Sequence, residues 1–84
     1  MITSFAVFFI TFNVTYHINI KKIGLNISFI RKSKNIKQVE LAYMCGIEKQ
    51  NLCRIETGRT NPTIKTLFII AENLEVSITD IINI

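Results

Sequence analysis

The sequence has few of the residues that enzymes and metal sites use. It contains one histidine, His17, and two cysteines, Cys45 and Cys53, which stand eight residues apart. A zinc site needs clustered ligands at short spacing, and these three residues offer no such arrangement. A Ser-His-Asp set, a paired-carboxylate motif and a phosphate-cradling glycine loop are missing as well. We therefore expect that the protein is not an enzyme and that it holds no metal and no cofactor.

The two cysteines are expected to be reduced and structural. Each stands at a helix position that we expect to be inward or half-buried, where a free cysteine behaves as a small hydrophobe. A redox switch is the alternative, and it would need an exposed thiol with a lowered pKa.

Charged residues are missing from the first twenty positions. Residues 1–10 are mostly apolar, and from Phe12 to Ile20 apolar residues alternate with polar ones. Alternation with a period of two is typical of a β-strand with one apolar face. We therefore expect residues 1–21 to form a separate apolar segment, either a strand or disordered, in front of a domain over residues 22–84.

Three interpretations of this apolar segment stay open. It could be a strand arm that joins two copies of the chain, because an unpaired apolar strand seeks another edge. It could follow from a translation start upstream of the true one, or it could bind a membrane. A full membrane span is not expected, because roughly 20 mostly apolar residues are required. A signal peptide would need a Lys or Arg in front of the apolar run and a small-residue cleavage site behind it.

The formal charge of +4 hides an uneven distribution along the 84 residues. All ten Lys and Arg residues lie between positions 21 and 65, where three Glu residues oppose them, so that this stretch carries a net charge of +7. The remainder carries −3. A chain of this length forms one small domain. A basic stretch within such a domain suits a polyanionic partner, nucleic acid above all.

Residues 37–62 contain the most informative pattern. Two short helical stretches are joined by Gly46, which can take the left-handed backbone conformation of a tight turn. Helical spacing places Leu41, Ala42 and Cys45 on one inward face, and Leu52 and Ile55 on the next. The outward positions of the second helix hold side chains that can donate hydrogen bonds to base edges in a DNA major groove, namely Lys49, Gln50, Asn51 and Arg54.

This helix-turn-helix pattern resembles the DNA-binding domain of the Xre/Cro family of bacterial and phage repressors. The family pattern is Gln, Leu-Ala, Gly, then Ile-x-x-Glu-x-Gly and a later Pro. The chain supplies it in order, with Gln38, Leu41, Ala42, Gly46, Ile55, Glu56, Gly58 and Pro62. Further matches before and after extend the resemblance over roughly residues 22–84.

The resemblance implies an all-α fold, a five-helix repressor-like bundle with the extra apolar segment in front. It also implies a structural ion pair between Arg31 and Glu56, which would link the first helix to the end of the recognition helix. DNA phosphates would be held at the start of the second helix and in the loop after the recognition helix, by Gln38, Arg59, Thr60 and Asn61.

Local signals place the ends of the expected helices. The first helix should run from about Gly24 to Lys34, with Asn35 tolerating a left-handed C-cap. Thr63 should cap the fourth helix, and Ser77 to Asp80 resembles a capping box for a short last helix. Lys37 and Glu48 stand where the second and third helices need caps, and neither is a good cap, at a cost of about 1 kcal/mol each.

The sequence therefore predicts a cytoplasmic, sequence-specific DNA-binding transcriptional regulator. We expect a homodimer that reads an inverted repeat in double-stranded DNA through residues 48–56. A phage-type repressor, a restriction-modification controller and an antitoxin all fit this description. The alternative is a protein-interaction module, resembling an antitoxin that binds a partner protein, with weak or no DNA binding. A membrane-tethered regulator is the third hypothesis.

Overall fold

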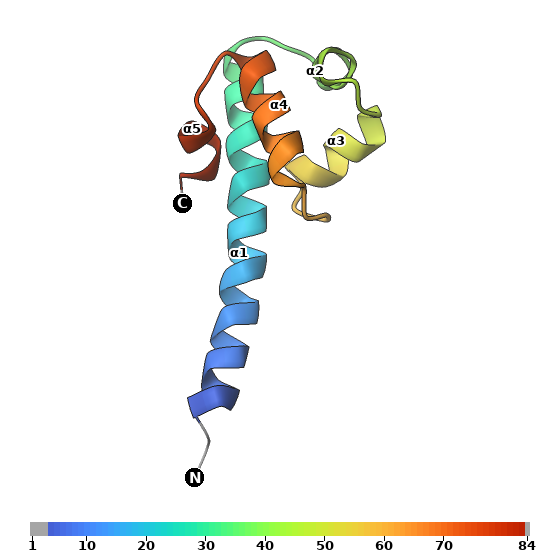
Figure 1. Ribbon diagram of the computed structural model, residues 1–84. Coiled ribbons are helices and arrows are strands. Elements are labelled where there is room, and N and C mark those ends of the chain that lie inside the picture. The colour runs from blue at the N-terminus through green and yellow to red at the C-terminus, as the bar shows by residue number, and fades with distance from the viewer. Residues whose placement is uncertain (1–3, 84) are drawn as a thin grey trace.

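The computed structural model describes the backbone of residues 4–83 and the side chains of residues 19–83. The described chain forms five helices and contains no strand: α1 (Ser4–Ser33), α2 (Gln38–Cys45), α3 (Lys49–Glu56), α4 (Ile64–Leu74) and α5 (Ile78–Ile82) (Figure 1). The all-α, five-helix architecture predicted from the sequence is confirmed. None of the described helices is both long and apolar enough to cross a membrane.

Helix α1 differs from the prediction. It begins at Ser4 instead of near Gly24, and residues 12–20, which were predicted to form a strand, continue the helix. The sequence holds no Gly or Pro between Ser4 and Ile23, so no residue there interrupts a helix whose later turns are fixed by packing. The first half of α1 projects beyond the other four helices (Figure 1). The strand prediction and the β-arm built on it are therefore wrong, and residues 1–3 lie outside the described range.

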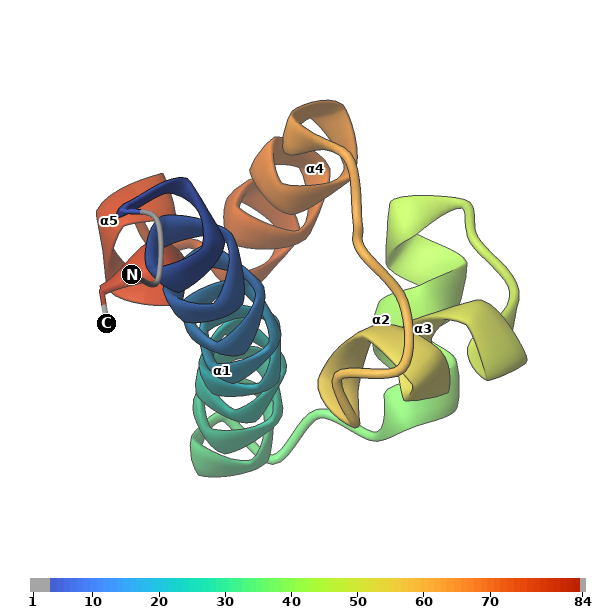
Figure 2. The ribbon, with the colours of Figure 1, turned by 90° about the horizontal axis from the view of Figure 1, so that it is seen from below.

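The core lies where the last part of α1 meets the four shorter helices. Viewed along α1, α4 and α5 lie on one side of the bundle and the α2–α3 pair on the other (Figure 2). The buried hydrophobic side chains are those expected from helical spacing, namely Ile27, Leu41, Ala42, Cys45, Leu52, Ile55, Leu67, Ile70, Ala71, Leu74 and Ile81. One expectation was wrong. Cys53 is exposed, because it follows Leu52 by about 100° around α3 and so turns away from the core.

Glycine allows α1 to approach α3 closely. A Cβ atom on Gly24 would lie 2.7 Å from the carbonyl oxygen of Glu56 and closer still to that of Ile55. Gly58, with φ +72°, meets α1 in the same way, since a Cβ there would lie 2.7 Å from Cγ of Lys21. The end of α3 and Gly58 in the following loop are thus held directly against α1.

The helix ends follow local chemistry. Gly46 (φ +69°) and Asn35 (φ +59°) take the left-handed conformation that ends α2 and α1. Oγ1 of Thr63 accepts from the backbone N–H of Thr66 at 3.1 Å, which caps α4 as predicted. The capping box predicted at the start of α5 is also present, because Oδ2 of Asp80 accepts from the backbone N–H of Ser77 at 3.1 Å.

Candidate nucleic-acid interface

Helix α3 has one buried face and one exposed face. Leu52, Ile55 and Glu56 point into the bundle. The residues expected to contact bases are all exposed on the remaining surface of the helix: Lys49, Gln50, Asn51 and Arg54. Two cationic and two amide side chains therefore share a solvent-facing surface, a composition that can donate to base edges in the major groove.

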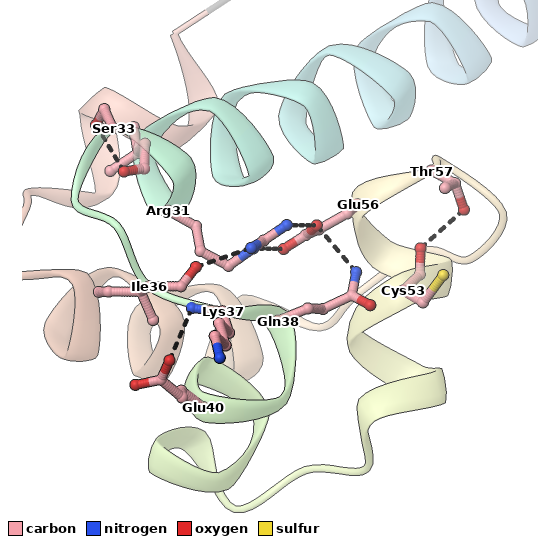
Figure 3. A network of polar contacts seen from close by, with 10 residues as sticks. Arg31, Ser33, Ile36, Lys37, Gln38, Glu40, Cys53, Glu56 and Thr57 are labelled. Carbon is pink, nitrogen blue, oxygen red and sulfur yellow. Dashed lines mark hydrogen bonds and ion pairs between the residues drawn. The ribbon is translucent and has the colours of Figure 1, made fainter.

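A buried ion pair connects α1 to the end of α3 (Figure 3). Nε of Arg31 lies 2.7 Å from Oε2 of Glu56, and Nη2 lies 3.0 Å from Oε1. This two-point geometry matches the planar guanidinium to the carboxylate. The exposed fractions of the two residues are only 7% and 6%. Because such a pair lies away from water, its hydrogen bonds fix the orientation of α3 relative to α1 more than they add to stability.

Helix α2 joins the same network through Gln38 (Figure 3). Nε2 of Gln38 donates to Oε1 of Glu56 at 3.1 Å, and Nη1 of Arg31 donates to the carbonyl oxygen of Ile36 at 2.9 Å. Glu56 thus accepts hydrogen bonds from α1 and from the start of α2. The Xre/Cro resemblance implies that Gln38 braces the recognition helix as well as contacting a phosphate, but its partner Glu56, 18 positions away, was not identified from the sequence.

The loop after α3 begins beside the exposed face of that helix. Thr57 closes α3 by donating from Oγ1 to the carbonyl oxygen of Cys53 at 2.8 Å, and the backbone N–H of Arg59 donates to the carbonyl oxygen of Arg54 at 2.8 Å. Arg59 and Asn61 are exposed, and Thr60 is half-buried. The three loop residues expected at phosphates therefore follow directly from the end of the recognition helix, whereas Gln38 lies at the start of α2.

The starts of α2 and α3 are capped unequally. Oε1 of Glu40 accepts from the backbone N–H of the N-cap residue Lys37 at 3.2 Å, which forms one half of a capping box at α2, but the Lys37 side chain has no acceptor for the N–H groups of the first turn. No side chain caps α3, where Glu48 occupies the N-cap position. The first backbone N–H groups of α3 and the positive end of its dipole are therefore available to an anion in front of the helix.

The described side chains bring together no metal-ligand cluster, and they place Cys45 in the core. Among them, no group of three His, Cys, Asp or Glu residues is close enough to hold a metal ion. Burial raises the pKa of the Cys45 thiol, and a hydrogen bond from Asn73 opposes this effect only in part. Cys45 therefore stays a protonated thiol in the core, as expected of a structural cysteine.

Comparison with known proteins places this geometry in a family. A helix-turn-helix family model matches residues 27–81. The uncharacterized HTH-type transcriptional regulator y4dJ of Sinorhizobium fredii is 39% identical over 57 residues, which make up 68% of this chain and 74% of that protein. Antitoxin PezA of Streptococcus pneumoniae is 35% identical over 60 residues, which make up 71% of this chain but 38% of the antitoxin.

A solved structure agrees with the sequence matches. The wild-type restriction-modification controller protein C.Esp1396I superposes with a TM-score of 0.66 at 36% identity, over 69% of this chain and 75% of that one. Residues 27–81, which the family model matches, begin within α1 and end in α5, so they contain the whole helix-turn-helix unit. The chain belongs to the helix-turn-helix family, as the Xre/Cro resemblance of its sequence predicted.

Proposed function

We propose that this protein is a sequence-specific DNA-binding transcriptional regulator that inserts α3 into the major groove. The observation that carries the proposal is the division of α3 into a face locked to α1 and α2 by Glu56 and a face that presents Lys49, Gln50, Asn51 and Arg54 to solvent. Side chains that read bases need a rigid support, because small displacements break bidentate hydrogen bonds. Within this face Arg54 and Lys49 suit guanine, and Gln50 and Asn51 suit adenine.

The DNA backbone would be held chiefly beside the end of α3, where Gln38 bonds to Glu56 and the following loop begins. Arg59, Thr60 and Asn61 lie in the loop that leaves the end of α3, and Gln38 lies at the start of α2. Contacts of this kind fix the register of a protein on the duplex and carry no sequence information themselves. The uncapped start of α3 offers a further group of N–H donors toward the same backbone.

The protein acts as a homodimer on an inverted repeat. One helix-turn-helix unit of this size reads only a short half-site, and two units related by two-fold symmetry read two half-sites one helical turn apart. The roles of phage-type repressor, restriction-modification controller and antitoxin all use such binding to block or adjust transcription. Because its target would be chromosomal or phage DNA, the protein acts in the cytoplasm.

A protein-interaction module is the second candidate, favoured by one surface. Val39, Tyr43 and Met44 of α2 expose 54%, 87% and 46% of their surface, although they are large and apolar. Exposed apolar groups that lie together are typical of protein contacts. In this role the chain would resemble an antitoxin that binds its partner, and PezA is one of its relatives.

Selection of duplexes from a random pool by gel shift tests both candidates. The regulator is expected to enrich one inverted repeat and to shift it as a complex of two chains. Enrichment of no sequence, with binding that depends on salt alone, would contradict the regulator. A double variant Tyr43→Ala, Met44→Ala should leave the selected repeat bound, and loss of selection in that folded variant would instead give the α2 surface the main role.

A further inference from the structure

A pocket of about 590 Å³ opens between α1, the start of α2 and the end of α3. One wall is a single face of α1, on which Lys21, Leu25, Ser28 and Lys32 follow one another at helical spacing. The opposite wall consists of Gln38, Glu56 and Thr57, and Arg31 lies at the base between them. The pocket is therefore built directly on the ion-pair network that orients α3.

The charges around this pocket favour an anion. Glu56 is neutralised by Arg31 through two hydrogen bonds, which leaves the positive charges of Lys21 and Lys32 without an opposing carboxylate among the lining residues. Arg31 has five N–H groups, of which three donate to Glu56 and to the carbonyl oxygen of Ile36. Two N–H groups of a buried guanidinium thus remain for a ligand, together with the hydroxyl group of Ser28, whereas the hydroxyl of Thr57 already donates to the carbonyl oxygen of Cys53.

The position of the pocket identifies the kind of anion. Lys21 contacts Gly58, the residue that leads into Arg59 and the rest of the loop. Lys21 and Lys32 stand eleven residues apart on α1, or roughly 16 Å along the helix axis. Two cations so far apart do not enclose one small ion, but they can follow neighbouring phosphates of a polyanion.

We propose that this pocket binds the phosphate backbone of the target DNA and that Lys21 and Lys32 extend the DNA-binding surface from the helix-turn-helix onto α1. The inference rests on the proposed function and deepens it. Lys21 stands outside the part of the chain that resembles the Xre/Cro pattern, so its role follows only from its place in the pocket. The ligands are neighbouring phosphate groups of the DNA backbone and not free phosphate ions.

The test compares the two lysines that line the pocket with two nearby lysines that do not line it. Lys21→Gln and Lys32→Gln remove charge from the pocket, whereas Lys22→Gln and Lys34→Gln remove the same charge from exposed lysines outside it. Affinity for the selected repeat is measured between 50 and 200 mM salt. Each pocket variant is expected to lower the slope of log K against log salt by about 0.9 and to weaken binding roughly three- to tenfold. The two control variants should retain the slope of the parent protein.

Two further measurements separate the competing explanations. Lys21→Arg keeps the charge and should restore the parent slope, which excludes a folding defect as the cause of the Lys21→Gln effect. Inorganic phosphate is titrated into the DNA-free protein and followed by NMR, and no millimolar binding that depends on Lys21 is expected. If such binding appears while the DNA slope stays unchanged, the pocket takes a free anion and the assignment to DNA is overturned.

The outcomes also distinguish this inference from the proposed function. If the parent protein selects a repeat and all four Gln variants change the slope equally, or none changes it, the pocket has no backbone role although the regulator stands. If the parent protein selects no repeat, the proposed function fails, and the pocket assignment fails with it.

Discussion

On its inner face α3 buries Leu52, Ile55 and Glu56, whereas its outer face exposes Lys49, Gln50 and Arg54. Each inner side chain has neighbours fixed by the fold, and Glu56 accepts hydrogen bonds from two other helices. The outer side chains project into solvent. The inner face therefore sets the stability and the orientation of the helix, and the outer face sets what the helix binds. Substitutions on one face should change the free energy of unfolding, and substitutions on the other should change DNA affinity.

The largest effect is expected for Glu56→Ala. This change leaves the buried guanidinium of Arg31 without a counter-charge and Gln38 without its acceptor, and the loss of one partner of a buried pair costs about 3–5 kcal/mol of unfolding free energy. Urea denaturation followed by circular dichroism measures it. The double variant with Arg31→Met should recover part of the loss, because no unpaired charge then remains. Strict additivity of the two changes would show that the residues do not interact.

Gly24→Ala should cause the next largest change in the free energy of unfolding, and two opposing contributions decide whether it stabilises or destabilises the protein. Alanine in the middle of a helix gains about 0.5–1 kcal/mol over glycine. The new methyl group would collide with the backbone carbonyl oxygens of Ile55 and Glu56, which cannot turn aside as a flexible side chain could. Overpacking of this kind costs about 1–3 kcal/mol, so we expect net destabilisation.

Ser33→Ala in the exposed last turn of α1 is a comparison variant that also places alanine in α1 but away from α3. It removes only the exposed hydrogen bond from Oγ of Ser33 to the carbonyl oxygen of Ile30, so its unfolding free energy should change by less than about 0.5 kcal/mol. A Gly24→Ala protein that is more stable than the parent would show that α1 and α3 can separate without loss, and the distinction between a locked and a free face of α3 would disappear.

The extent to which the sequence predicted this structure depends on how local each feature is. Thr63 and Ser77 could be identified as caps because their partners stand three residues away. The hydrogen bond between Gln38 and Glu56 and the pocket beside α1 depend on how three helices pack. This packing depends in turn on single residues, such as Gly24, whose missing side chain lets α1 approach the end of α3. The strand prediction for residues 12–20 failed for a related reason. The alternation of apolar and polar residues is a local signal for a strand, but here these residues continue the helix that packs in the bundle.

Arg54→Ala tests the outer face. It should cost about 1–3 kcal/mol of binding free energy at the selected repeat while changing non-specific affinity little, because a bidentate contact to guanine discriminates between bases. Unfolding free energy should stay within about 0.5 kcal/mol of the parent, since Arg54 is exposed. Arg59→Ala provides the contrast, because a phosphate contact should weaken all sequences alike and lower the salt slope by about one. If Arg54→Ala lowered the affinity for specific and for random DNA equally, Arg54 would contact a phosphate of the DNA backbone and not a base.

The smallest effect is expected at the junction of the two faces, for Glu48→Ser. Serine at the N-cap can accept from the unpaired N–H groups of the first turn of α3, which stabilises by about 1 kcal/mol. The same change removes a carboxylate near the positive end of the helix dipole, which costs about 0.3–1 kcal/mol at low ionic strength. The net gain in unfolding free energy should therefore be small at low salt and should rise toward about 1 kcal/mol as salt screens the dipole term. Glu48→Gln removes the charge without supplying a good cap, so it should lose stability at low salt and approach the parent at high salt. A Glu48→Ser gain that shrinks with salt would mean that the hydroxyl does not cap α3, and the start of the recognition helix would then owe its stability to contacts on the inner face.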